Sequence, residues 1–138
     1  MASADSSRGL IQFNVNVPGT RPVLMVDGGR ISVSLTGIGV DGLSALNGAD
    51  VMVHGMRVSP RDIVVSSYSV RAVGGFAVLD GQLQRGEKGD WNIALADRSG
   101  TRTLSSIPEA LQTALGARIW IDASNTTRPQ TFGIITRR

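Results

Sequence analysis

Apolar and polar residues alternate along most of this chain, in short segments separated by glycine, proline and aspartate. The clearest pattern occurs twice, as Gly-Ala-Asp-Val-Met-Val-His at residues 48–54 and Gly-Ala-Arg-Ile-Trp-Ile-Asp at residues 116–122. In each copy branched aliphatic residues occupy every second position after Gly-Ala, which is the period of a half-buried β-strand. We therefore predict two matching strands whose core-facing side chains are Val51, Val53, Ile119 and Ile121.

Similar alternation predicts the remaining strands, at residues 11–17, 23–26, 31–35, 63–65, 76–79, 91–95, 101–104 and 131–136. Asp27-Gly28 between two of them indicates a hairpin turn. Only one helix is expected. Ser106-Ile107-Pro108-Glu109 has the form of a capping box, and it predicts a helix near residues 107–115 that stops at Gly116. The predicted fold class is all-β with one short helix.

The order of these segments suggests an internal repeat. Residues 76–81 match residues 23–28, and residues 91–95 match residues 31–35, so both halves read as hairpin, linker, strand, turn and strand. This pattern predicts two duplicated small β units packed together, at residues 9–70 and 71–138, after a flexible polar arm at residues 1–8. Chance similarity between two β-rich halves, or a single β-sandwich, also fits the pattern.

The order of the predicted elements resembles that of an OB-fold barrel: a strand, hairpin strands, a helix and two closing strands. The segment from Leu111 through Gly116-Ala117-Arg118-Ile119-Trp120-Ile121 is similar to the helix-glycine-strand entry of bacterial OB-fold proteins of the cell envelope. The resemblance is best in residues 71–138 and looser in the first half, whose helix is weak. It implies one or two OB-like barrels and a bacterial envelope origin.

Composition narrows the choice of protein class. The 138 residues are 41% hydrophobic and 18% charged, with a net charge of +3 and no cysteine, so a disulfide scaffold and cysteine-based chemistry are excluded. The chain has no run of 18 apolar residues that would predict a membrane-spanning helix. Ala2-Ser3-Ala4 resembles a signal-peptidase site and suggests a periplasmic or secreted protein. An ordinary polar N-terminus of a cytoplasmic protein is the alternative.

Candidate catalytic chemistry is sparse. His54 is the only histidine, and the chain contains neither a Gly-x-Ser-x-Gly elbow nor a glycine-rich phosphate loop. Asp27, Asp41 and Asp80 each precede glycine, which is typical of turn residues. We therefore expect no catalytic site, no metal site and no cofactor. Aromatic residues make up only 4% of the chain, which disfavours a base-stacking surface for nucleic acids.

The outward faces of the two repeated strands are the candidate interaction residues. Met52 and His54 lie on this face in the first copy, and Arg118, Trp120 and Asp122 lie on it in the second. A large apolar residue thus occupies the same outward position in each copy. Tryptophan is enriched at binding hot spots and methionine adapts to varied surfaces, so a contact surface is one interpretation. Burial of both strand faces is the other.

These observations favour a non-catalytic binding or assembly module, a protein–protein interaction subunit of a larger bacterial complex, acting on a protein partner or on its own copies. The alternative is an OB-type domain that binds an oligonucleotide, a saccharide or a small polar molecule. That alternative predicts that Arg102, Arg128 and the loop at residues 85–90 line one cleft. An enzyme using aspartate and arginine groups is the third possibility.

Overall fold

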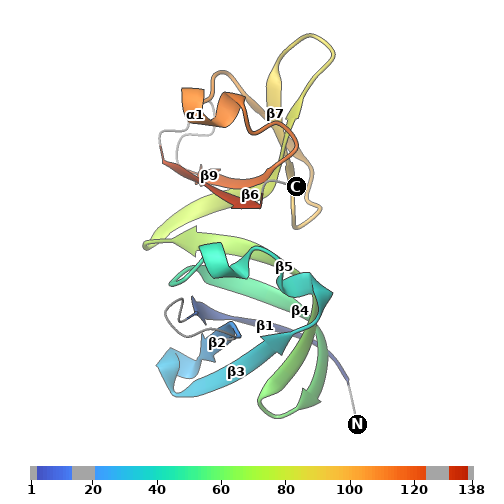
Figure 1. Cartoon of the computed structure of the whole chain (residues 1–138), viewed down its shortest axis with the longest axis vertical. Helices are drawn as coiled ribbons and strands as arrows, with labels where there is room; N and C mark the ends of the chain where they lie inside the picture. The colour runs from blue at the N-terminus through green and yellow to red at the C-terminus, as the bar shows by residue number, and fades with distance from the viewer. Residues whose placement is uncertain (1–2, 14–20, 124–130, 137–138) are drawn as a thin grey trace. The chain divides into compact units, whose positions relative to one another are not determined.

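The structure is a computed structural model, and it describes residues 3–13, 21–123 and 131–136. The chain divides into two compact units, Met1–Gly74 and Gly75–Arg138. Strands dominate both units, and one short α-helix occurs in the second (Figure 1). The predicted all-β class is confirmed.

Five strands build the first unit, with three single 3-10 turns between them. Their bounds are β1 (Ser3–Gln12), β2 (Val23–Val26), β3 (Ile31–Thr36), β4 (Asp50–Ser59) and β5 (Asp62–Val73). The 3-10 turns are η1 (Asp27–Gly29), η2 (Ile38–Val40) and η3 (Leu43–Ala45). Asp27, Gly28 and Gly29 all have positive φ, which explains why the predicted turn uses an Asp-Gly pair.

The five strands of the first unit close into a barrel. β1 pairs with β2 and β4, β2 pairs with β3, β4 pairs with β5, and β3 and β5 close the ring with a parallel pairing of residues 34–36 and 62–64. Aliphatic side chains from every strand fill the interior, among them Ile11, Leu24, Val33, Val51 and Ile63. This closed five-stranded barrel is compatible with an OB-like fold.

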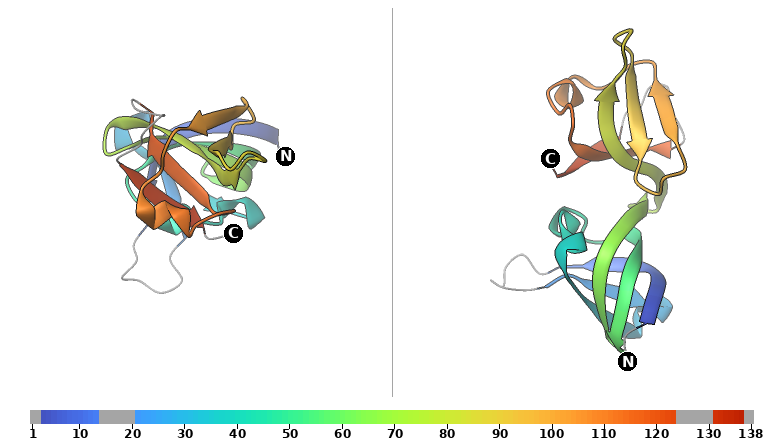
Figure 2. Two further views of the ribbon diagram at one scale, coloured as in Figure 1. Left: turned by 90° about the horizontal axis from the view of Figure 1, so that it is seen from above. Right: turned by 90° about the vertical axis from the view of Figure 1, so that its right-hand side faces the viewer.

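The N-terminal segment is part of this barrel. Residues 3–8, for which we predicted a flexible arm, form the first half of β1 and pair with β4 from Ser3↔Arg57 to Arg8↔Met52. The long β4–β5 hairpin beside them is visible in Figure 2. The prediction was wrong because these small polar residues show no apolar alternation. Their backbone N–H and C=O groups are nevertheless hydrogen bonded to β4, which is distant in sequence.

The second unit contains five more strands and the helix. Its elements are β6 (Phe76–Arg85), β7 (Trp91–Leu95), β8 (Thr101–Leu104), α1 (Glu109–Gln112), β9 (Arg118–Asp122) and β10 (Phe132–Thr136). All pairings are antiparallel, in the order β8-β7-β6-β9-β10. The core consists of Leu83, Ile93, Leu104, Ile107, Leu111, Ala114, Ala117, Ile119 and Ile121.

The helix is shorter than predicted. It spans only Glu109–Gln112, and Pro108 with an extended backbone (φ −57°, ψ 146°) occupies its N-cap without a side-chain hydrogen bond. The predicted capping box at Ser106 is therefore absent, because proline at this cap shifts the start of the helix past Ser106. Leu111 is fully buried and anchors the turn in the core. In the described parts of the chain, no helix is long and apolar enough to span a membrane.

The closed barrel lies in the half where we expected it least. Among the described residues of the second unit, β8 pairs only with β7 and β10 only with β9, so no pairing closes the ring there. The first unit closes although a single 3-10 turn, η3, stands where an OB-fold has its helix. The pairing of β3 with β5 closes the barrel, and no helix is needed for this. We had expected the barrel in the second half because the sequence predicts a helix there.

The two units nevertheless share their strand order. In both, Gly-Ala of the repeated motif exchanges backbone hydrogen bonds with the first strand, Gly48 and Ala49 with Ile11, and Gly116 and Ala117 with Leu83, at 2.7–2.9 Å. The equivalence of residues 48–54 and 116–122 therefore holds. The other matches were wrong, because β6 corresponds to β1 and β7 to β2, so residues 76–81 are not the counterpart of residues 23–28.

Glycine occupies the same point on the first strand of each unit. A Cβ at Gly9 would lie 2.3 Å from the Met25 carbonyl oxygen, and one at Gly81 would lie 2.2 Å from the Ala94 carbonyl oxygen. At these residues the first strand passes from one neighbouring strand to the other. Only glycine permits such a close backbone approach.

Candidate interaction surface

The repeated strands present the predicted faces. Val51, Val53, Ile119 and Ile121 are fully buried, while Met52 and Trp120 are half-buried and His54 is exposed. Met52 and His54 belong to the first unit, and Arg118, Trp120 and Asp122 belong to the second. Alternation thus predicted the inward positions correctly. The outward residues belong to two separate units, so each group is described within its own unit.

Trp120 contributes to the packing of its own sheet. It lies directly opposite Gly133 on β10, and a Cβ at Gly133 would lie 2.3 Å from the indole Nε1. The ring therefore occupies the space that a side chain at Gly133 would need. This packing explains why Trp120 is half-buried without an interaction with a partner.

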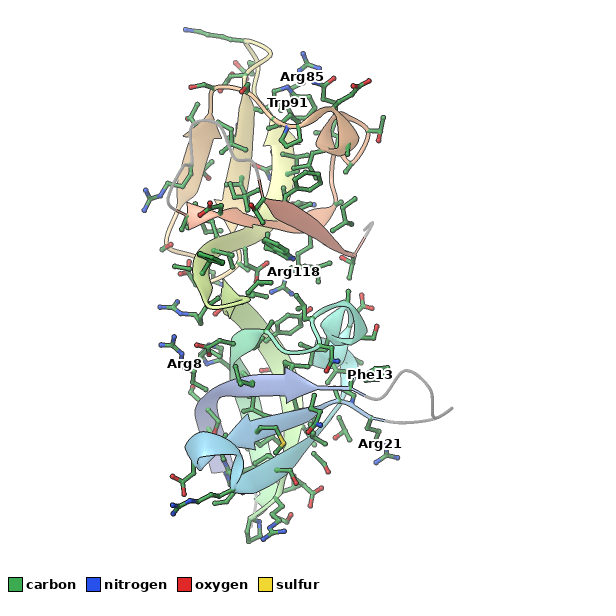
Figure 3. All side chains as sticks on the ribbon, turned by 90° about the vertical axis from the view of Figure 1, so that its left-hand side faces the viewer. Arg8, Phe13, Arg21, Arg85, Trp91 and Arg118 are labelled. Atoms are coloured by element: carbon green, nitrogen blue, oxygen red, sulfur yellow. The ribbon has the colours of Figure 1, made fainter. Side chains whose placement is uncertain are left out.

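Arg118 is bound to Asp80, a buried carboxylate on β6. Its Nε donates to Asp80 Oδ1 at 2.8 Å and its Nη2 donates to Asp80 Oδ2 at 2.6 Å, the two-pronged geometry that arginine forms with carboxylates (Figure 3 labels Arg118). Asp80 was read from the sequence as a turn residue, but it lies within a strand. A hollow of about 240 Å³ beside Arg118 is lined by Gly81, Gln82, Ala94, Ala96, Gly116 and Thr136.

The first unit has the same ion pair with its charges reversed. Arg8 on β1 donates from Nε and Nη2 to Asp50 on β4, with an Nη2–Oδ2 distance of 2.8 Å. Arg8 is opposite Met52 as Asp80 is opposite Trp120, so the positions correspond. The carboxylate raises the pKa of Arg8 through this hydrogen bond. A groove of about 480 Å³ adjoins the pair and includes Leu10, Met25 and the turn at residues 27–29.

His54 is held by two serines. Ser6 Oγ and His54 Nδ1 are hydrogen bonded at 2.8 Å, and Ser66 Oγ donates to the His54 carbonyl oxygen at 3.0 Å. These residues line an open hollow of about 620 Å³, which we call the His54 hollow; it is formed by Ala4, Asp5, Ser6, His54, Gly55, Met56 and Ser66. No group of three or more His, Cys, Asp or Glu side chains that could bind a metal occurs in the described residues.

Exposed apolar side chains continue this face toward the β4–β5 turn. Met56, Val58 and Val64 are 43%, 48% and 41% exposed, and we call them the apolar patch. Met56 lies directly opposite Val64 on β5 and opposite Ala4 on β1, and Val58 follows on the same face of β4. Ala4, Met56, Val58 and Val64 thus form a small apolar surface across three neighbouring strands, and the exposed Asp62 of β5 adjoins it two residues before Val64.

The sequence contained a signal for this patch that we did not use. β4 continues its alternation beyond His54, and the next two outward positions, Met56 and Val58, are both apolar. Arg57 and Asp5 nearby are paired, since Arg57 Nε donates to Asp5 Oδ2 at 2.6 Å and Arg57 Nη2 donates to Ser7 Oγ at 3.1 Å. Asp62, which adjoins Val64, accepts a hydrogen bond from the Ser59 hydroxyl. Hydrogen bonding to Arg57 lowers the pKa of Asp5.

The cleft expected for a small ligand is not assembled by the described residues. Arg85 lies over the ring of Trp91 at 4.8 Å and its Nε donates to the Gly89 carbonyl oxygen (Figure 3), whereas Arg102 lies on β8 opposite Ile93. No described contact joins Arg102 to the loop at residues 85–90. Arg128 lies outside the described residues.

Comparison with protein-family models, with curated proteins and with solved structures finds no match.

Proposed function

We propose that this chain is a non-catalytic protein-binding or assembly module. The observation that carries the proposal is the apolar patch, in which three neighbouring apolar side chains remain exposed on the outer face of a three-stranded sheet. Burial of apolar surface is the main source of free energy in protein association, and contiguous exposed apolar residues mark contact sites.

The composition of the surface supports a protein partner. The apolar patch carries no charge, and its edge on one side consists of Ser6, His54 and Ser66, whose polar groups are hydrogen bonded. Interfaces between proteins have this arrangement, an apolar centre depleted in charge within a polar rim. Met56 adds a flexible side chain that adapts to the surface it contacts.

Site-specific photo-crosslinking tests the proposal in the cells that produce the protein. A photoreactive residue at Val64 should capture a protein and give an adduct of defined mass. The same residue at Thr101, exposed on β8, is the matched control and should not give that adduct. Adducts that are the same at both positions, or no protein adduct at all, would contradict the proposal.

A second candidate function is favoured by the groove beside Arg8. There the Arg8–Asp50 ion pair adjoins the exposed side chain of Leu10 and the half-buried side chain of Met25. A few polar groups beside apolar surface suit a saccharide or another small polar molecule. NMR titration with a panel of monosaccharides and a short oligothymidylate should shift the Leu10 and Met25 resonances, and Arg8→Ala should remove those shifts.

A further inference from the structure

We infer that His54 and Met56 form a binding site for a soft monovalent metal ion, Cu(I) or Ag(I). Both residues lie on the outer face of β4, two positions apart, and both line the His54 hollow. Thioether sulfur is a ligand that selects Cu(I), and imidazole nitrogen also suits copper. The inference goes beyond the proposed function and does not depend on it, since the protein contact requires no metal.

The spacing brings the two donor atoms within reach of one ion. Alternate residues of a strand lie on the same face, about 6.5 Å apart along it. The imidazole Nε2 and the thioether Sδ both extend beyond Cβ, and the flexible methionine side chain can turn its sulfur toward the histidine. Met56 is 43% exposed and His54 is also exposed, so an ion in solution has access to both.

Hydrogen bonds hold His54 in position for this role. Ser6 Oγ lies 2.8 Å from Nδ1, and Ser66 Oγ donates to the His54 carbonyl oxygen at 3.0 Å. When the Nδ1–H donates to Ser6 Oγ, the lone pair of Nε2 is available to a metal. Histidine ligands usually have their other ring nitrogen bonded in this way, which fixes the tautomer and orients the ring. Ser6 is therefore a positioning residue of the site.

The surroundings favour a soft ion over a hard one. Hard ions such as Mg²⁺ and Ca²⁺ need several oxygen ligands. Asp5 borders the hollow, but its carboxylate is already bonded to Arg57. The described residues contain no group of three or more His, Cys, Asp or Glu side chains that could hold a metal. The described lining of the hollow includes neither lysine nor arginine, so no cationic side chain there opposes a bound cation.

Met52 is the alternative sulfur ligand, because it lies on the same face of β4 on the other side of His54. It is directly opposite Arg8, whose guanidinium charge opposes a cation, and it is not part of the lining of the hollow. Met56 is opposite the uncharged Ala4. We therefore assign the sulfur ligand to Met56, and the remaining coordination positions of the ion are open to water.

Titration of the intact chain with silver nitrate in chloride-free buffer tests the inference, with Ag(I) as the air-stable probe. NMR spectra should show one bound ion that shifts the Met56 methyl and His54 ring signals. Met56→Leu keeps the size of the side chain and removes its sulfur, and it should weaken binding roughly tenfold or more, as should His54→Gln. Met25→Leu, on β2 of the same unit, is the matched control and should leave the affinity unchanged.

Two further measurements separate a built site from a chance contact. Ser6→Ala should weaken Ag(I) binding roughly tenfold, because the ring loses the hydrogen bond that orients it. An unchanged affinity in this variant would overturn the positioning role of Ser6. Titration with Zn²⁺ should give much weaker binding than Ag(I), and equal affinities would overturn the assignment to a soft ion.

Circular dichroism establishes that each variant is folded. If Met25→Leu or Met52→Leu weakens binding as much as Met56→Leu does, or if all methionine signals shift together, the chain binds an adventitious ion only and the inference fails. The photo-crosslinking experiment at Val64 is done without added metal. Its outcome therefore tests the proposed function separately from this site.

Discussion

At the scale of single residues, Asp80 shows how far a local pattern can mislead. It precedes Gly81, as turn residues do, yet it is only 5% exposed and is bonded to Arg118 across the strands. A buried carboxylate is tolerated when its charge is paired and its oxygens accept hydrogen bonds. Asp80 and Arg118 should therefore act as one structural unit.

Arg118→Met should lower the free energy of unfolding by about 1–3 kcal/mol, because the buried Asp80 carboxylate loses the two hydrogen bonds that Arg118 donates to it. Urea denaturation followed by circular dichroism measures the change. Arg8→Met is the matched control, and its effect should be much smaller because Arg8 is half exposed to water. If both variants lowered the free energy of unfolding equally, burial would not make the Asp80–Arg118 pair more important to stability than the Arg8–Asp50 pair.

Asp5 should make the stability of the protein depend on pH in the acid range. Its folded-state pKa lies below the ordinary value of 3.8, chiefly because Arg57 donates a hydrogen bond to it. The stability that this contact supplies is therefore present above that value and is lost as the pH falls through the folded-state pKa. Thermal midpoints measured from about pH 6 down to pH 2 should fall more for the wild type than for Asp5→Asn. Parallel curves would contradict this.

At the scale of the elements, the glycine in the first strand of each unit controls how closely the strands approach. Gly81→Ala should cost about 1–3 kcal/mol or more of unfolding free energy, because its Cβ would meet the backbone oxygen of Ala94. Gly86→Ala is the control, since its Cβ would meet only the movable carboxylate of Asp90. Chemical denaturation should rank Gly81→Ala as the more damaging of the two.

The edge strand β8 should depend on Arg102 for solubility. Arg102 lies opposite the buried Ile93, so it places a charge on the core-facing side of a strand that pairs only with β7 in the described chain. Such charges prevent strands of different molecules from pairing. Arg102→Val should increase light scattering and oligomer formation, whereas Thr103→Val, on the other face of the same strand, should not.

At the scale of the whole molecule, the sequence predicted the strands better than their connections. Alternation located part of every strand and the inward side chains of β4 and β9, because a period of two is a local property. It placed the first strand at residues 11–17, of which 14–17 lie outside the described residues, and it missed most of β5 and the second half of β6. It could not show that β3 closes on β5, or that β6 takes the place of β1, because those pairings join residues distant in sequence. We assigned the barrel to the second half because of its predicted helix, but closure of the barrel does not require a helix.

Alternation predicted the outward positions of the two repeated strands for the same reason, but it did not predict the apolar patch. Met52, His54, Arg118 and Trp120 lie on the outward faces, as alternation requires. Their neighbours were unpredictable from spacing, since Asp80 and Gly133 reach Arg118 and Trp120 only through strand pairing. Met56 and Val58 could have been found by following β4 beyond its repeated segment.

The reversed polarity of the two ion pairs has a consequence for how the chain folds. The two units share a strand order, so while the chain is still unfolded β1 and β6 compete for the same place beside β4 or β9. If β1 took the place of β6, Arg8 would meet Arg118, and if β6 took the place of β1, Asp80 would meet Asp50. Like charges at such positions are destabilising. Opposite polarity therefore lets each first strand distinguish its own unit, and the incorrect exchange is penalised before either core is complete.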